Sequence, residues 1–326
     1  MTRTATWIAL SMMWPLGLLL VVANMEIAEV TMPVFVILDA AYVAGSSWLL
    51  QRVRAGRAGR VDPETTRIAT ILVLNGVGLF AVVGFTGIPS AGEPDLLMLN
   101  TAALLGTAVV LLVAATSLLW MHRDSPRVTS VVPTVVVFVV GSTLYVANLL
   151  ARVAVVLSGA AQQQAAVEDT AWVAHEYLRG LYPAPDFMGY LLVWMDLLQL
   201  AYVVSAFLAV AAVARLLGGR AIAGGAGRVL RIAGNILAAV IVIGVALAVV
   251  LPRDFDAVPA WAAFVASIPF MTTLLPFVLG LAMLHSSARR FTSHPPTESP
   301  AVPQIPELVG TNPTPFPSPT DKGPTR

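Results

Sequence analysis

The sequence predicts an all-α, polytopic membrane protein with eight transmembrane helices arranged as a parallel 4+4 tandem repeat. Hydrophobic residues make up 57% of the 326 positions and charged residues only 11%, whereas about a quarter of the residues of a soluble domain are charged. Apolar runs of about 20 residues, the length that crosses roughly 30 Å of hydrocarbon, recur along the chain. Short motifs of the first half also recur in the second half, which predicts the repeat.

Eight apolar runs are long enough to cross a bilayer as helices. Glycine and proline inside several of them do not argue against helices, because neighbouring helices in a bundle satisfy the freed backbone groups. The predicted spans are residues 7–24, 30–50, 68–85, 96–121, 131–157, 188–214, 232–251 and 260–284.

Matching segments at similar positions of the two halves define the repeat. Val22-Ala23-Asn24 recurs as Val146-Ala147-Asn148, Ala41-Tyr42-Val43 as Ala201-Tyr202-Val203, and Arg67-Ile68-Ala69 as Arg231-Ile232-Ala233. Each half holds four helices, an even number, so both halves enter the membrane in the same direction and are related by an axis along the membrane normal. We therefore predict a first unit, 1–127, and a second unit, 128–291. The alternative is chance similarity between helices rich in Val, Ala and Leu.

The basic residues predict the orientation. Of the 19 lysine and arginine residues, all but Arg152, Arg179 and Arg253 fall on one side of the predicted eight-span arrangement. The positive-inside rule places that side in the cytoplasm. We expect a multi-pass protein of the plasma membrane, with both termini cytoplasmic.

Two segments lie outside the predicted spans. An insertion at about residues 159–187 occurs only in the second unit, on the outer side, and its core at 162–182 is predicted to be an amphipathic helix at the membrane interface; the alternative is a lid or a docking surface for a partner. The tail, 292–326, is rich in proline, serine and threonine and is predicted to be disordered in the cytoplasm. Besides the lipid bilayer, a membrane or cytoplasmic protein partner would bind one of these two segments, and no nucleic acid is expected.

Three charged residues fall inside predicted spans, where a charge costs about 2.5–3.5 kcal/mol on insertion scales and is a functional candidate by default. Asp39 and Asp196 lie in the outer parts of spans that begin on the outer side of the membrane, and Arg152 lies near the outer end of its span. Each aspartate has polar neighbours at helical spacing, and such a face must contact protein or water. The candidate intramembrane polar site is Asp39, Tyr42, Arg152, Asp196, Gln199 and Tyr202.

This site has two interpretations. In the functional one, the acidic residues line an outward-facing cavity that binds a proton, a cation or a polar solute. In the other, Arg152 and Asp196 form a buried ion pair, and Asp39 forms a hydrogen bond with a tyrosine or asparagine, so that the polar residues only fix helix packing.

Little in the sequence indicates an enzyme or a cofactor. The absence of cysteine excludes disulfides and thiolate metal sites. His122 and His285 close two apolar runs at matching positions, so a pair of haem or metal ligands, or a quinone contact, is one hypothesis. The alternative is two interfacial histidines at helix ends. No cofactor and no catalytic residue is predicted.

The sequence therefore predicts a transporter or channel-like protein for a small solute or ion that uses intramembrane acidic residues. One alternative is a non-catalytic or quinone- and redox-associated membrane subunit of a larger complex. Another is a membrane sensor that uses the outer insertion and the tail.

Overall fold

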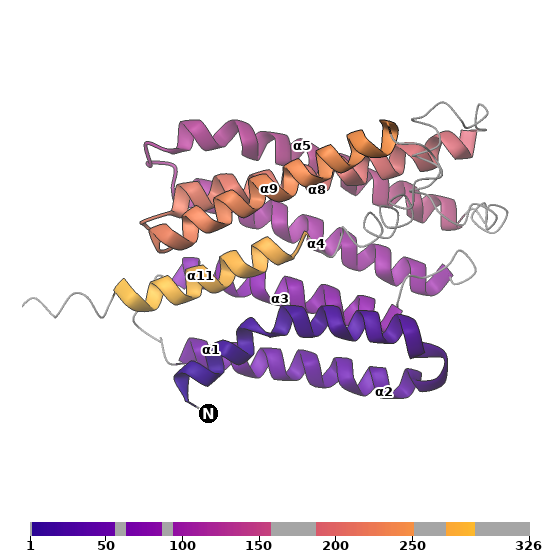
Figure 1. Ribbon diagram of the computed structural model, residues 1–326, viewed down its shortest axis with the longest axis horizontal. Coiled ribbons are helices and arrows are strands. Elements are labelled where there is room, and N and C mark those ends of the chain that lie inside the picture. Colours follow the sequence, from indigo (N-terminus) through magenta and orange to yellow (C-terminus); the bar gives the residue numbers. More distant parts are fainter. Residues whose placement is uncertain (1, 56–62, 87–93, 158–186, 251–271, 291–326) are drawn as a thin grey trace, which may run out of the picture.

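The computed structural model describes residues 2–55, 63–86, 94–157, 187–250 and 272–290, and within these ranges it contains helices and no named strand. Figure 1 shows the arrangement. The predicted insertion, apart from Phe187, and the predicted tail lie outside the described residues. The helices are α1 (Arg3–Ser11), α2 (Met13–Ala55), α3 (Pro63–Thr86), α4 (Pro94–Met121), α5 (Val128–Leu157), α8 (Phe187–Leu217), α9 (Gly224–Val250) and α11 (Leu274–Arg290).

Six of the described helices are long and apolar enough to cross a membrane, which fits an integral membrane protein. They overlap the second to seventh predicted spans. The first predicted span is a bent pair, α1 and the start of α2, with an angle of 40° between its two parts. The eighth predicted span lies partly outside the described residues; its described part is a turn at 272–273 and α11. The count of eight and the repeat stay predictions.

The long helix α2 folds back on itself. Its 43 residues would extend about 65 Å if straight, yet the Tyr42 hydroxyl donates a hydrogen bond to the Met13 carbonyl oxygen at 3.1 Å. In a straight helix these two residues would be about 43 Å apart. Figure 1 shows the reversal at the right of the view, between a first leg, 13–23, and a second leg, 34–55. A break was predicted between the two spans at residues 25–29, but the backbone there is helical.

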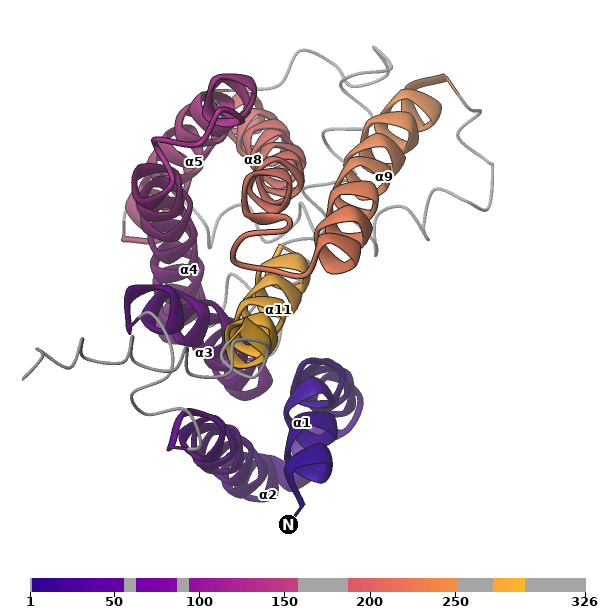
Figure 2. The same cartoon turned by 90° about the vertical axis from the view of Figure 1, so that its left-hand side faces the viewer.

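Successive helices pack as neighbours, and α11 packs against three of them. Contacts join α2 to α3, α3 to α4, α4 to α5, α5 to α8 and α8 to α9, while α11 contacts α3, α8 and α9. Figure 2 shows α3, α4, α5 and α8 as an arc with α11 beside it, α9 on one side and α1 with α2 on the other. Helices α2, α4, α8 and α11 end at the same end of the bundle, where most described arginines lie; we call it the arginine-rich end (left in Figure 1).

Several of these helix pairs touch through glycine. A β-carbon on Gly280 of α11 would lie 2.7 Å from the Ala69 carbonyl oxygen of α3, and one on Gly234 of α9 would lie 2.6 Å from the Phe207 carbonyl oxygen of α8. Real β-carbon contacts are longer, so only glycine permits these backbones to approach so closely. Small residues serve this purpose in membrane helix pairs, where close packing replaces the hydrophobic drive that lipid cannot supply.

The outer faces of the bundle are apolar. On α9, Val229, Ile232, Ile236, Val240 and Ile243 are each about half or more exposed, and their spacing of three or four residues places them on one face of the helix. An exposed apolar face of this length is unusual for a soluble monomer and is expected where a helix contacts lipid.

The glycine-rich stretch that follows α8 is a compact turn. Gly219 has a positive φ of 79°, a conformation that glycine adopts without strain. Arg127, from the connection between α4 and α5, donates from Nη1 to the carbonyl oxygens of Arg215 and Gly218 at 3.1 and 2.7 Å. A cation at the last carbonyl groups of a helix is favourable, so Arg127 caps α8 from a neighbouring connection.

We predict that Gly280→Ala destabilises the protein by about 1–3 kcal/mol, because the added methyl group overpacks the α3–α11 contact. Gly106→Ala on α4 is the matched control, since a β-carbon there meets nothing within 4 Å. It should be neutral or gain up to about 1 kcal/mol from higher helix propensity. Thermal unfolding in detergent measures both, and equal effects at the two positions would contradict the close contact.

Candidate functional site

Asp39 lies on the buried face of the second leg of α2. Phe35, Asp39, Tyr42, Ser46 and Leu49 are all less than a tenth exposed, and their spacing of three or four residues puts them on one side of the helix. Asp39 and Tyr42 therefore share one face of α2, while their role as a binding site stays a prediction. This face turns toward α3 and the first leg of α2, which are the neighbours of the second leg.

The Asp39 carboxylate points at a glycine of α3. A β-carbon on Gly84 would lie 2.8 and 2.9 Å from the two carboxylate oxygens, Oδ1 and Oδ2. Gly84 is two residues from the end of α3 at Thr86, so the carboxylate sits toward the end of the bundle opposite the arginine-rich end. The absence of a side chain on Gly84 leaves the space that the carboxylate occupies.

Neither carboxylate oxygen of Asp39 has a hydrogen-bond partner within the part of the chain that the structure describes, although the residue is only 7% exposed. Tyr42, one turn away, interacts with Asp39 electrostatically. The Tyr42 hydroxyl, however, donates its hydrogen bond to the Met13 carbonyl oxygen. The packing interpretation expected a tyrosine or asparagine hydrogen bond to Asp39, and no such bond is present among the described residues. Asp39 thus has its full capacity to accept hydrogen bonds or a cation.

Polar residues also gather between α5 and α8. The Tyr145 and Tyr202 rings stack 4.2 Å apart at an angle of 7°, and Phe138 lies 6.3 Å from Tyr202 on the same side. Gln199, predicted as a site residue with Tyr202, lies three residues before Tyr202 on α8 and is only 7% exposed. Ser142, Asn148 and Ser205 from the same two helices are also buried. This polar cluster, unlike Asp39, is built around an aromatic stack.

The turn before α11 lies beside both the first leg of α2 and the aromatic stack between α5 and α8. Trp14, on the first leg of α2, donates from Nε1 to Thr273 Oγ1 at 3.2 Å, while Thr272 lies beside the Tyr202 hydroxyl group. Trp14 also packs edge-on against Phe80 of α3, at 5.2 Å between ring centres. A connected row of polar and aromatic side chains therefore crosses the bundle from the first leg of α2 to α5.

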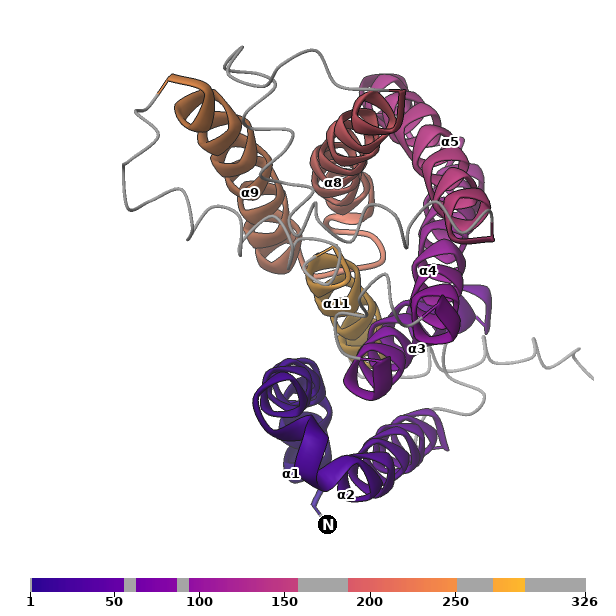
Figure 3. The same ribbon diagram turned by 90° about the vertical axis from the view of Figure 1, so that its right-hand side faces the viewer.

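The four predicted site residues whose side chains the structure describes lie at two places in the bundle. Asp39 and Tyr42 lie together on α2, and Gln199 and Tyr202 lie together on α8, with α3 and α11 between these helices in Figures 2 and 3. The side chains of Arg152 and Asp196 lie outside the described residues. Their predicted ion pair, and their role beside Asp39, stay predictions.

Three aromatic residues of the row, Trp14, Phe138 and Tyr145, were not predicted from the sequence. Aligning Val22-Ala23-Asn24 with Val146-Ala147-Asn148 also pairs Trp14 with Phe138 and Gly17 with Gly141. Both aromatic residues are buried. Extending the motif match toward the N-terminus by eight residues, or just over two helix turns, would have identified them. Thr272 and Thr273 carry no comparable signal, because their contacts depend on where α11 begins.

The histidine hypothesis has no support from the described contacts. The His285 ring packs edge-on against Trp7 of α1, at 5.4 Å between ring centres. His122 lies in the turn that follows α4. Among the described residues, no group of three or more His, Cys, Asp or Glu side chains is placed to hold a metal ion. The interaction of these histidines with haem, a metal or a quinone stays a hypothesis.

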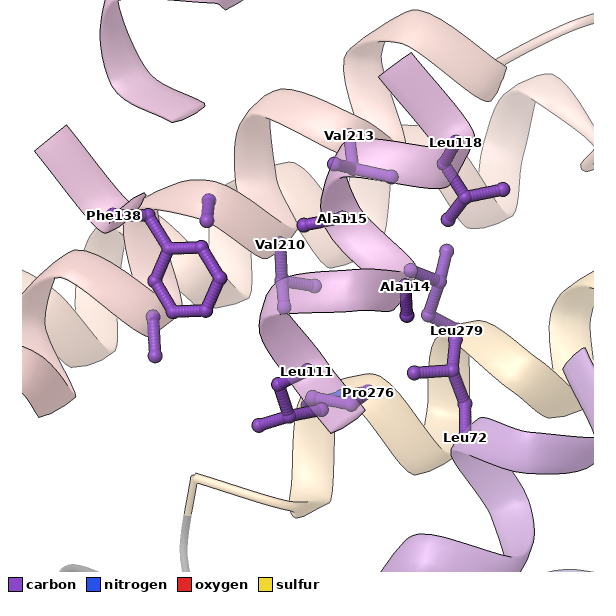
Figure 4. A pocket seen from close by; sticks show the side chains of 12 residues that line it. Leu72, Leu111, Ala114, Ala115, Leu118, Phe138, Val210, Val213, Pro276 and Leu279 are labelled. Atoms are coloured by element: carbon purple, nitrogen blue, oxygen red, sulfur yellow. The ribbon is translucent and has the colours of Figure 1, made fainter. Parts of the chain in front are cut away.

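An internal cavity lies between α3, α4, α5, α8 and α11 (Figure 4), but it is not part of the polar site. Its volume is about 30 Å³, and its walls are aliphatic side chains with Phe138 at one side. A water molecule needs polar partners to occupy a cavity of this size. The cavity therefore offers nothing to a proton, an ion or a polar solute.

No protein-family model, curated protein or solved structure matches the chain.

We predict a coupling between Trp14 and Thr273 of about 0.6 kcal/mol, the average for hydrogen bonds between membrane helices. A double-mutant cycle of Trp14→Phe and Thr273→Val, measured by thermal unfolding in detergent, isolates the bond from the packing that each substitution also changes. The control cycle pairs Thr273→Val with Trp120→Phe, since Trp120 is 69% exposed on α4. Coupling in the control cycle equal to that of Trp14 would rule out a specific bond.

Proposed function

We propose that this protein is a transporter or channel-like membrane protein for a proton or a small cation, and that Asp39 is the group that binds it. The observation that carries this proposal is the buried Asp39 carboxylate, which has no hydrogen bond within the described residues. A bare carboxylate in such surroundings is costly. A bound proton or cation removes that cost, and its release restores it.

The position of Asp39 also suits a binding group near one mouth of a pathway. It faces Gly84, close to the end of α3. Beyond Gly84, Asn100 of α4 donates from Nδ2 to Thr86 Oγ1 at 3.2 Å, and Thr101 is buried beside it in sequence. These oxygen-bearing side chains lie at the same end of α3 and α4 as Gly84, and oxygen ligands are those that small hard cations prefer.

The proposed architecture is eight spans in two parallel units, with the arginine-rich end in the cytoplasm of a plasma-membrane protein. Its support is a set of equivalent contacts. Tyr42 and Tyr202 occupy matching positions, and each contacts the helix that precedes its own span. Gly17 and Gly141 also match, and a β-carbon on either would lie 2.6 Å from a hydroxyl oxygen of the following span, that of Tyr42 or Ser205.

The alternative functions stay predictions. A redox-associated subunit would need a cofactor contact, and a sensor would depend on the insertion and the tail; most of the insertion and all of the tail lie outside the described residues. The unpartnered carboxylate favours ion binding over both.

We predict that Asp39→Asn lowers proton or cation flux into proteoliposomes by about tenfold or more, because a contact to a charged group contributes about 1.5–3 kcal/mol. Flux is measured with an internal pH-sensitive dye, and with dyes for sodium and potassium, under an imposed membrane potential. Gly84→Ala should also lower flux, since its methyl group would displace the carboxylate.

Gly78→Ala is the control for Gly84→Ala. It lies on the same helix, and a β-carbon there meets nothing within 4 Å, so its flux should equal that of the unmodified protein. Unchanged flux in a folded Asp39→Asn variant, or no flux of any of the three ions through the unmodified protein, would refute the proposal and leave Asp39 a packing residue.

A further inference from the structure

A second cavity opens on the surface between α3 and α4, which lie side by side in Figures 1 and 3. It is a groove of about 760 Å³ at the arginine-rich end of the bundle. Ile68 and Ile71 of α3 and Val109 and Val113 of α4 form much of its length. Val113 is 56% exposed, so the groove is open on its outer side.

The polar groups of the groove gather at one end of it. Glu64 and Arg67, in the first two turns of α3, face Trp120 near the end of α4. The Arg67 side chain is exposed and has no hydrogen bond or ion pair with another described residue. Trp120 is 69% exposed, and the Arg123 guanidinium group lies over its ring, 4.5 Å from the ring centre. Glu64 and Arg67 are the charged residues that line the groove, and Arg123 adds a second guanidinium group beside it.

The length of the groove matches one leaflet of a bilayer. Its residues on α4 extend from Val109 to Met121, which corresponds to about 18 Å of helix. Half of the hydrocarbon core is about 15 Å thick, and the headgroup layer lies beyond it. A tryptophan near a helix end, with arginines beside it, is the usual arrangement at the headgroup level.

We infer that this groove is a binding site for an anionic phospholipid of the leaflet at the arginine-rich end. The phosphate group binds Arg67, with Arg123 near it across Trp120, and an acyl chain lies along Ile71, Val109 and Val113. An amphipathic occupant with one anionic end fits, because guanidinium groups are available at one end of the groove and the remainder is mainly apolar. A phospholipid has this form and the matching length.

A second copy of the chain fits the groove less well. A twofold axis along the membrane normal, the commonest dimer symmetry, would bring one Arg67 toward the other if it passed through the groove. Like charges placed together in an apolar setting disfavour association.

The test is native mass spectrometry of the full chain in mild detergent, with dioleoyl phosphatidylglycerol or dioleoyl phosphatidylcholine added at equal concentrations. We expect tighter binding of phosphatidylglycerol, and Arg67→Gln should weaken it about fivefold, the factor expected for one arginine beside an anionic headgroup. Arg231→Gln is the matched control. It is exposed at the corresponding position of α9 and does not line this groove, so phosphatidylglycerol binding should not change.

A second variant tests the apolar part. Val113→Trp fills the groove and should also lower phosphatidylglycerol binding, while Val240→Trp, on the exposed face of α9, should not. Both replaced residues are exposed, so the bundle should fold in each case.

The inference is overturned if Arg67→Gln and Arg231→Gln have equal effects, if Val113→Trp binds phosphatidylglycerol as the unmodified protein does, or if the two lipids bind equally. It is also overturned if the spectra contain a dimer that Val113→Trp abolishes, because the groove would then be an interface between two copies. None of these results depends on ion transport.

Discussion

A β-carbon on Gly280 would lie 2.7 Å from the Ala69 carbonyl oxygen, and this close approach of α11 to α3 positions much of the bundle. Inside a bilayer, burying an apolar surface between two helices brings no hydrophobic gain, because lipid tails are equally apolar. Helices there associate through close packing, including short contacts between backbones. With α11 held against α3, the turn at 272–273 comes within reach of Trp14 on one side and Tyr202 on the other. The row of polar side chains therefore depends on a glycine that is not part of it.

The sequence predicted the helices better than their contacts. The length of an apolar run is a local property, so six predicted spans coincide with six long helices. The helical period is also local, and Asp39, Tyr42 and Ser46, which it places on one face of the helix, are all buried. The partner of Asp39 was not predictable, because Gly84 has no side chain to indicate a role and its place beside the carboxylate depends on how α2 packs on α3. For the same reason, the grouping of Asp39 with Arg152 and Asp196 stays a prediction.

The buried polar groups near the two legs of α2 are of two kinds. Tyr42 and Trp14 each donate a hydrogen bond across a helix pair, which satisfies the donor and joins the helices at once. Asp39 has no such bond among the described residues. A group of the first kind stabilises one arrangement, whereas a group of the second kind has a different energy with and without a bound ion. Asp39 and Tyr42 lie within one helix turn of each other on α2. Ion binding at Asp39 would therefore occur beside the Tyr42 hydrogen bond, a contact that resists movement.

The bond between Trp14 and Thr273 joins residues that are 259 positions apart in the chain. At about 5–20 residues per second, the ribosome makes Thr273 roughly 13–50 s after Trp14. During that interval the indole N–H of a helix already in the bilayer lacks this acceptor. Newly made chains should therefore present a first helix whose Trp14 N–H lacks its acceptor to the insertion machinery. Truncation before residue 273 should leave a chain that cellular quality control recognises as unfinished.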